Sequence, residues 1–287
     1  MKPSRRSFLR NSLQTVAAAP LFAGLGLSSS IAAEVSKSGA PKTEHCKFDL
    51  GLASYTTRKF DRAQTIAMAR RAGLKFMCFK DFHLKLDSTD EECAAAAEEC
   101  QKAGMKLYGG GVITMKKPED VENAFRYAKA CGMNTIVSVP HPEILELVDK
   151  KVKETDIRIA IHNHGPGDKL YPTPDVIMEK IEKFDKRIGL CIDVGHTERI
   201  GADVIEAFKK YADRLHDVHF KDETEKTPKG HTCICGRGVL DIPGYVAALV
   251  EIGYDKIVSF EYEADADDPL PGLMESIGYV RGVMRMM

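Results

Sequence analysis

Residues 188–222 read IGLCIDVGHTERIGADVIEAFKKYADRLHDVHFKD, and this stretch indicates the fold. It opens and closes with short apolar runs at 188–193 and 215–220, and a helix-like pattern at 203–212 separates them. The first run is continuously apolar up to Asp193, which is typical of strands buried on both faces of a parallel sheet. The second run, LHDVHF, also contains polar residues. The stretch therefore predicts one strand–helix–strand unit.

The same unit recurs along the chain. Strands are predicted over 48–54, 76–80, 105–112, 134–139, 157–163, 188–193, 215–220 and 257–261, and helices over 61–72, 89–103, 118–131, 142–154, 174–184, 203–212, 242–252 and 272–285. The largest interval between strands holds an insertion at 222–240. Eight such units predict an α/β fold, a single (β/α)8 TIM barrel over 47–287. An open doubly wound sheet is disfavoured because no glycine-rich phosphate fingerprint follows the first strand.

The composition is that of an ordinary globular chain. Its 287 residues are 44% hydrophobic and 29% charged, which excludes a disordered or collagen-like protein. Lys and Arg total 41 and Asp and Glu total 42, so the net charge is −1. Because a phosphate-backbone binder needs a basic excess, no nucleic-acid partner is expected.

The N-terminus carries an export pattern. Arg5 and Arg6 precede an apolar run at 16–27, and small residues follow that run. The run is short for a bilayer span, which favours a cleaved signal peptide over the alternative, an uncleaved anchor. The pattern resembles a twin-arginine signal. We therefore predict a signal peptide at 1–33, a polar linker at 34–46, no stable membrane anchor, and an exported, periplasmic protein.

The cysteines all lie beyond the predicted signal peptide. Those in apolar runs or helix patterns are expected to be buried, unreactive thiols. Cys233 and Cys235 are expected to be a pair of thiols in a loop. A zinc site is disfavoured there, because the spacing of His231, Cys233 and Cys235 matches no strong zinc-binding pattern. The disulfide state of this pair stays open.

Polar side chains follow the last four predicted strands. The clusters are His162-Asn163-His164, Asp193-Val194-Gly195-His196, His219-Phe220-Lys221-Asp222 and Glu261-Tyr262-Glu263. Catalytic groups of such barrels come from the carboxyl ends of the strands, so these clusters are expected to meet at one end. Mixed imidazole and carboxylate groups suit a transition-metal ion better than Ca²⁺. Side-chain alternation along a strand favours His219 over His216, and the earlier strand-end position favours Glu261 over Glu263.

Four short motifs carry a family resemblance. They are Asp193-Val194-Gly195-His196, His219-Phe220-Lys221-Asp222, Gly236-Arg237-Gly238-Val239-Leu240-Asp241 and Ser259-Phe260-Glu261. With these motifs, residues 48–265 resemble the xylose isomerase-like TIM barrels, the sugar phosphate isomerase/epimerase group. The resemblance implies that Asp193, His219 and Glu261 bind one divalent metal ion, and that His196 contacts the substrate.

The fourth metal ligand is less defined. Many members of the group place a metal-binding Glu where this chain has His162, so His162 is the first candidate and His164 the second. Mn²⁺ is the first expectation for the ion, with Zn²⁺, Co²⁺, Fe²⁺ or Mg²⁺ as alternatives. In epimerases of this group, two paired glutamates can exchange protons on opposite faces of the substrate. This chain has His162 in place of one of them, which weakens the case for a symmetric, two-base epimerase.

The chemistry that these residues permit is proton abstraction next to a carbonyl, through an enediolate. Glu261 is the first candidate for the base, and His164 and His196 are alternatives. The predicted substrate-binding residues are His196, Lys221, Lys80, His83 and Arg237. The last four have structural alternatives: a salt-bridged residue at the rim for Lys221, a solvated loop for Lys80 and His83, and a brace for the long loop for Arg237.

The expected function is a divalent-metal-dependent sugar isomerase or epimerase acting on a small carbohydrate. The first alternative is a metal-dependent lyase that eliminates a β-oxygen from a keto-sugar or keto-glycoside. Export favours this alternative, because sugar phosphates are mainly cytoplasmic. The second alternative is a non-catalytic sugar-binding barrel. The sequence is compatible with a homo-oligomer.

Overall fold

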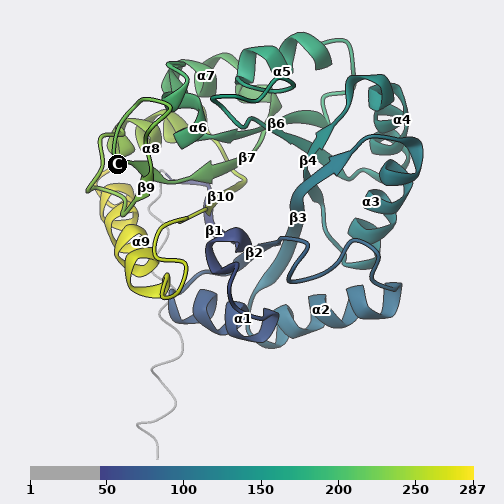
Figure 1. Ribbon diagram of the computed structural model, residues 1–287, viewed down its shortest axis with the longest axis horizontal. Coiled ribbons are helices and arrows are strands. Elements are labelled where there is room, and N and C mark those ends of the chain that lie inside the picture. Colours follow the sequence, from purple (N-terminus) through teal and green to yellow (C-terminus); the bar gives the residue numbers. More distant parts are fainter. Residues whose placement is uncertain (1–45) are drawn as a thin grey trace, which may run out of the picture. The chain divides into compact units, whose positions relative to one another are not determined.

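Eight parallel strands close into a barrel, which confirms the predicted (β/α)8 architecture. The computed structural model describes residues 46–287. The strands are β1 (Asp49–Ala53), β2 (Phe76–Phe79), β3 (Lys106–Met115), β4 (Thr135–Pro140), β5 (Arg158–His162), β6 (Ile188–Asp193), β7 (Leu215–Phe220) and β10 (Ile257–Phe260). They pair in the order β1-β10-β7-β6-β5-β4-β3-β2 (Figure 1). All eight carboxyl ends consequently lie at one end of the barrel.

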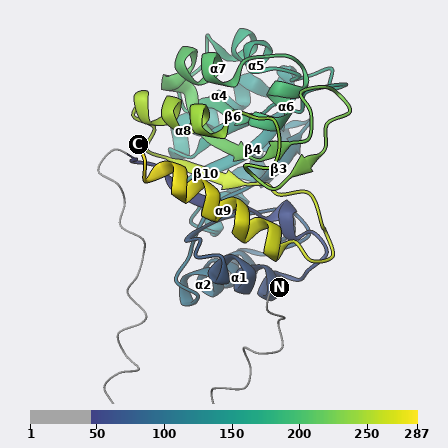
Figure 2. The same ribbon diagram turned by 90° about the vertical axis from the view of Figure 1, so that its left-hand side faces the viewer.

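Helices surround the strands (Figures 1 and 2). They are α1 (Arg62–Arg71), α2 (Asp90–Lys102), α3 (Pro118–Ala130), α4 (Leu145–Thr155), α5 (Pro174–Ile181), α7 (Val204–Lys210), α8 (Ile242–Glu251) and α9 (Leu270–Met284). Capping boxes fix where two of them begin: Asp61 pairs with Gln64 before α1, and Thr89 pairs with Glu92 before α2. The apolar helix faces pack against the outer faces of the strands and form the main core.

A smaller cluster fills the interior of the barrel. It consists of Cys78, Tyr108, Val137, Ala160 and Cys191. The Tyr108 hydroxyl donates a hydrogen bond of 2.8 Å to the Asp217 carboxylate and also contacts Ser259. This interior layer closes the barrel below the strand ends, so the ends of the strands form a separate site above it.

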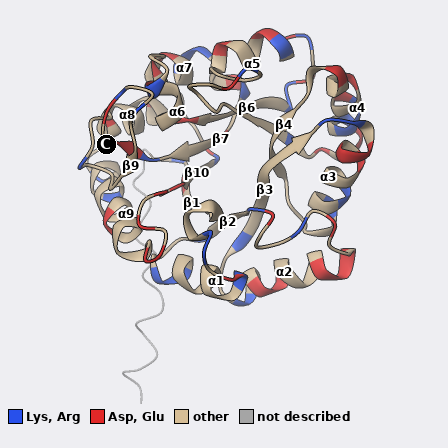
Figure 3. Cartoon of the chain, viewed as in Figure 1, with Lys and Arg blue, Asp and Glu red and all other residues tan. Residues whose placement is uncertain are grey.

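Charged side chains of both signs are interspersed over the helices (Figure 3). Many of them form exposed ion pairs, such as Arg62 with Glu99 at 2.8 Å and Lys209 with Glu251 at 2.7 Å. Exposed pairs of this kind contribute about 0–1 kcal/mol each. The apolar core must therefore supply most of the stability.

Two elements were not predicted from the sequence pattern. A short helix, α6 (Val194–Arg199), begins directly after β6. The insertion at 222–240 contains a two-stranded antiparallel sheet of β8 (Asp222–Glu223) and β9 (Thr232–Cys233). Three short 3₁₀ turns complete the described elements, at Ser54–Thr57, Pro142–Ile144 and Ala212–Arg214. Both unpredicted elements adjoin the strand ends and so shape the site.

The predicted signal peptide at 1–33 and the linker up to residue 45 lie outside the described residues. Within 46–287, none of the helices combines the length and the apolarity needed to cross a membrane. All eight cysteines are free thiols, and seven are buried. Cys233, the exception, is half-buried, and burial raises the pKa of its thiol to about 11.

Candidate functional site

The carboxyl ends of four neighbouring strands bring four predicted residues together. His162 ends β5, Asp193 ends β6, His219 lies on β7, and Glu261 follows β10. Parallel pairing sets Asp193 beside His219, and the backbone N–H of Glu261 donates to Phe220 O at 3.0 Å. One side-chain nitrogen or oxygen from each of the four lies within 4.8 Å of those of the other three. The structure thus brings His162 into this cluster, and not His164.

The cluster has the dimensions of a metal site. His162 Nε2 lies 3.1 Å from His219 Nδ1 and 3.5 Å from Asp193 Oδ2, and His219 Nδ1 lies 3.3 Å from Glu261 Oε2. Two atoms bound to one ion at about 2.1 Å, at angles of about 90–110°, lie about 3.0–3.4 Å apart. The four residues are at most 8% exposed. Two imidazoles and two carboxylates at this spacing therefore fit one divalent transition-metal ion.

Cys191 offers an alternative third donor beside His162 and His219. Its thiol lies inside the barrel, and burial raises its pKa well above the ordinary value. A protonated thiol is a poor metal ligand, because metals bind the thiolate. The set with the two carboxylates is thus the better donor set.

Lys221 is buried among the acidic groups of the site. Its Nζ lies 2.9 Å from Asp193 Oδ2 and 2.8 Å from Glu261 Oε2, and it also contacts Glu263. The alternative of a salt-bridged residue at the rim is thus right about the salt bridges and wrong about the rim, because the side chain is only 1% exposed. Three carboxylates and one ammonium carry a net charge of −2, which one divalent cation would neutralise.

Burial and charge set the protonation of the cluster. Burial lowers the pKa of His162 to about 3, so this imidazole is neutral near pH 7. Burial raises the pKa of Glu261, but Lys221 and His219 outweigh it and hold the pKa well below the ordinary value. Glu261 is thus an ionised carboxylate. A neutral imidazole and an ionised carboxylate are the forms that bind a metal.

His196 and His164 lie beside the cluster. The His162 ring centroid is 4.5 Å from that of His164 and 5.8 Å from that of His196. Asp193 Oδ1 accepts a hydrogen bond of 2.7 Å from the backbone N–H of His196 and so caps α6. His164, whose side chain is 38% exposed, also faces Asp168 at 3.5 Å. Both imidazoles are thus placed to contact a molecule bound at the cluster.

The other predicted substrate residues are held by different partners. Lys80 Nζ donates to Val112 O at 3.1 Å, and His83 is buried, with Nδ1 2.8 Å from Ser54 Oγ. The alternative of a solvated loop is therefore wrong for His83. Its ring joins the loops after β1 and β2 and is not aimed at the cluster. Lys80 is half-buried and remains a predicted substrate contact.

Arg237 braces the long loop. Its guanidinium makes two hydrogen bonds to the Glu275 carboxylate of α9, at 2.6 and 2.8 Å. The Asp222 carboxylate organises the same loop by accepting from the backbone N–H groups of Gly236, Gly238 and Leu240. These contacts support the structural alternative for Arg237, a brace for the long loop, and its contact with substrate stays a prediction.

Comparison with known proteins agrees with this arrangement. Residues 66–283 match the family model described as "Xylose isomerase-like TIM barrel". This chain belongs to the xylose isomerase-like TIM barrel family. The match includes all the residues of the cluster, so the family and the site concern the same part of the chain.

Individual relatives of the family are distant. An inosose dehydratase from Lacticaseibacillus casei is 27% identical over an alignment of 137 residues that covers 42% of this chain and 45% of that protein. The match thus spans less than half of this curated relative. Two solved structures share the fold. The 3-keto-D-glucoside 4-epimerase of E. coli has a TM-score of 0.68 at 14% identity, over 82% of this chain and all of that one. The IOLI protein with a bound zinc atom has a TM-score of 0.67 at 15% identity, over 83% and 98%.

Gly195 belongs to the Asp193–His196 motif, but no role of its own is predicted for it from the sequence. A Cβ atom at this position would lie 2.5 Å from Glu223 Oε1 and 2.8 Å from Lys221 Cδ. We expect Gly195→Ala to displace the Lys221 side chain and to lower the free energy of unfolding by about 1–3 kcal/mol. Urea unfolding measures the change. Gly282→Ala is the control, because nothing lies within 4 Å of a Cβ there. Equal stability of the two variants would contradict this packing.

Glu223 gives a pH dependence to stability. Burial raises the pKa of its carboxyl group to about 7 from an ordinary 4.5. Between these values the folded state holds a proton that the unfolded state has lost, so stability falls as the pH rises through this window. Glu223→Gln imitates the protonated form and removes the effect. The original protein should lose stability between pH 5 and pH 8, whereas the Glu223→Gln variant should not. We therefore expect the Tm of the variant minus the Tm of the original protein to increase by about 2–4 °C or more over this range. An unchanged difference in Tm would show that Glu223 ionises normally.

Proposed function

We propose that this protein is a metal-dependent enzyme that removes a proton next to the carbonyl group of a small carbohydrate. The observation that carries the proposal is the buried cluster of His162, Asp193, His219 and Glu261 at the carboxyl ends of four strands. Membership of the xylose isomerase-like family supports it. So do relatives whose names describe a dehydratase of an inosose and an epimerase of a keto-glucoside.

One divalent ion would be held by those four residues, with Mn²⁺ first and Zn²⁺ next. The zinc atom in the similar IOLI protein supports a transition metal. When bound, the ion supplies Lewis-acid polarisation of a substrate carbonyl. Polarisation acidifies the neighbouring C–H group, which a carboxylate can then deprotonate.

Glu261 is the proposed base. Its Oε2 lies in the cluster, and its ionised carboxylate can accept the proton. Lys221 lies against the same carboxylate and is the proposed donor to a substrate oxygen. His196 and His164 are proposed to contact the substrate hydroxyls, since they flank His162. This assignment places the base and an ammonium donor on the same side of the site.

We propose elimination of a β-oxygen from a keto-sugar or keto-glycoside as the overall reaction. Elimination needs a base at the carbon next to the carbonyl and an acid at the oxygen that leaves the neighbouring carbon. Glu261 and Lys221, which are 2.8 Å apart, are proposed for these two roles. An epimerase that works from both faces needs a second base, and His162 stands where many family members have a second glutamate. The similarity to inosose dehydratase supports the same choice.

Isomerisation or epimerisation is the second candidate. It was the first expectation from the sequence, and the fold likeness to the 3-keto-D-glucoside 4-epimerase supports it. Both reactions share the first proton removal and differ only in the fate of the carbanion. Reprotonation gives an isomer or an epimer, and loss of the β-oxygen gives an unsaturated ketone.

Proton NMR in deuterium oxide, with the Mn²⁺-loaded protein and a panel of inososes, 3-keto-glucosides and ketoses, tests the proposal. We expect loss of a substrate C–H signal together with an unsaturated product. Deuterium incorporation without elimination would favour the isomerase or epimerase. Binding of a sugar without any exchange would favour the non-catalytic barrel and contradict an enzyme. The metal-free protein is the control.

We also propose that the protein is exported through a twin-arginine signal. Material recovered from the periplasm should begin near residue 34, as N-terminal sequencing would show. Replacing Arg5 and Arg6 by lysine should keep most of the protein in the cytoplasm with its N-terminal segment intact. Periplasmic protein that retains Met1 would contradict cleavage.

A further inference from the structure

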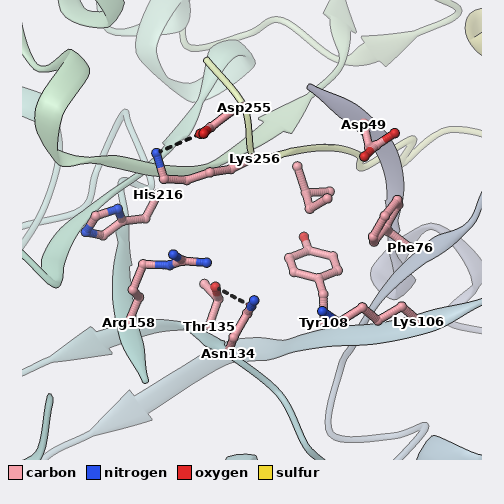
Figure 4. Close-up of a pocket in the computed structure, with 11 residues that line it drawn as sticks. Asp49, Phe76, Lys106, Tyr108, Asn134, Thr135, Arg158, His216, Asp255 and Lys256 are labelled. Atoms are coloured by element: carbon pink, nitrogen blue, oxygen red, sulfur yellow. Dashed lines mark hydrogen bonds and ion pairs between the residues drawn. The ribbon is translucent and has the colours of Figure 1, made fainter. Parts of the chain in front are cut away.

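A cavity lies at the opposite end of the barrel from the four-residue cluster. It has a volume of about 380 Å³ and is lined by residues at the amino ends of the strands (Figure 4). Tyr108 and Phe76 form an aromatic wall, with ring centroids 6.4 Å apart and ring planes at 72°. The volume is at the lower end of the range typical of small-molecule sites. None of the residues that carry the proposed function lines this cavity.

Arg158, the first residue of β5, extends its guanidinium into this cavity (Figure 4). Its Nε atom is buried and has no hydrogen-bond partner. A buried N–H donor without an acceptor costs free energy, because its lost hydration is not replaced. An acceptor that enters the cavity would restore the missing bonds.

Other donors surround the guanidinium. Lys106 and the Asn134 side chain also line the cavity. His216 is only 7% exposed, and its Nε2 lies 2.8 Å from Lys186 O, while its Nδ1 is buried without a partner. Burial lowers the pKa of His216 to about 4, so the ring is neutral near pH 7. Because Nε2 donates to Lys186 O, the neutral ring leaves Nδ1 as an acceptor. The donors that accompany Arg158 in the cavity are therefore Lys106 and the Asn134 amide.

The charges define the ligand further. The lining carries three cationic side chains and two carboxylates: Lys106, Arg158, Lys256, Asp49 and Asp255. Lys256 and Asp255 lie 3.5 Å apart and largely compensate each other. The net charge of +1 of the lining matches a monoanion better than a dianion such as phosphate. An apolar part of the ligand fits against Phe76 and Tyr108.

We propose that this cavity binds a small organic monocarboxylate, held by a bidentate contact with Arg158 and covered by the aromatic wall. A planar guanidinium matches the two oxygens of a carboxylate in this way. The site is independent of the proposed catalytic chemistry, which uses the other ends of the strands. Binding there would stabilise the barrel, because a ligand that binds only the folded state shifts the unfolding equilibrium.

Isothermal titration calorimetry with benzoate and acetate, at pH 7 and constant ionic strength, tests the proposal. We expect millimolar binding of both, with benzoate tighter, and a Tm higher by about 2 °C at saturating benzoate. Arg158→Met should lower the affinity for benzoate at least tenfold. Arg237→Met is the matched control and should bind benzoate normally, since its guanidinium is held by Glu275 elsewhere.

Lys106→Met covers the case in which Arg158→Met does not fold. Lys106 is exposed, so its replacement should leave the fold intact and weaken benzoate by a smaller factor. Absence of carboxylate binding by the original protein would overturn the proposal. Equal affinity for benzoate in the Arg158→Met protein would do the same, as would phosphate binding more tightly than either carboxylate.

Discussion

Replacing His219 by alanine should abolish tight binding of a divalent metal without unfolding the barrel. His219 Nδ1 lies within 3.3 Å of both His162 Nε2 and Glu261 Oε2, so its loss opens the centre of the cluster. Loss of an outer-shell partner already weakens metal binding by about 10–100-fold, so loss of a ligand should cost at least about 100-fold. Titration with Mn²⁺ and elemental analysis after dialysis measure the effect, and circular dichroism checks the fold.

Two companion variants sharpen this result. His216→Ala is the matched control, because His216 lies on the same strand but bonds to Lys186 O on the other side. It should lose stability and keep the metal. Asp193→Asn is preferable to alanine, because Asp193 Oδ1 also caps α6 through the His196 N–H. The Asp193→Asn variant should bind the metal more weakly and keep the N-terminal cap of α6. Unchanged metal content in both His219→Ala and Asp193→Asn would refute the assigned site.

Glu261→Gln should retain much of the metal and lose most of the turnover. Glutamine keeps the shape and one oxygen donor, but its amide is a very poor base. Loss of a general base typically costs about 10²–10⁴-fold in rate. The exchange of the substrate α-hydrogen with solvent deuterium, followed by NMR on the Mn²⁺-loaded variant, should therefore vanish as well.

Glu263→Gln is the control for this experiment. Glu263 contacts the same Lys221 but lies outside the four-residue cluster, so its variant should still exchange the α-hydrogen. Persistent exchange in metal-loaded Glu261→Gln would move the role of base to His164 or His196. Exchange that survives while product formation stops would mean that a later acid step has failed.

Much of the site could be predicted from the sequence because strand geometry is regular. Residues at the carboxyl ends of parallel strands meet at one end of a barrel, and alternation separates His219 from His216. The structure agrees on both points, since His219 faces the cluster and His216 lines the cavity at the opposite end. His162 is the first candidate for the fourth ligand because of the family resemblance, and the structure places it in the cluster at the end of β5.

The remaining features depend on contacts between distant segments. Arg237 is held by Glu275, 38 residues later in the chain, and no local sequence pattern predicts that pair. Lys221 lies on a strand end like a ligand, yet its burial depends on three carboxylates from two other strand ends. Gly195 is required by the close approach of Glu223 from the insertion, whose fold was not predicted.

A crystal structure of the Mn²⁺-loaded protein, with anomalous diffraction recorded at the manganese edge, tests the central claim most directly. We predict one strong anomalous peak about 2.0–2.3 Å from His162 Nε2, Asp193 Oδ2, His219 Nδ1 and Glu261 Oε2. Lys221 should then have moved away from at least one of the two carboxylates that it contacts. A peak at other residues, or none at saturating Mn²⁺ and Zn²⁺ with Lys221 still between Asp193 and Glu261, would contradict the metal-dependent function.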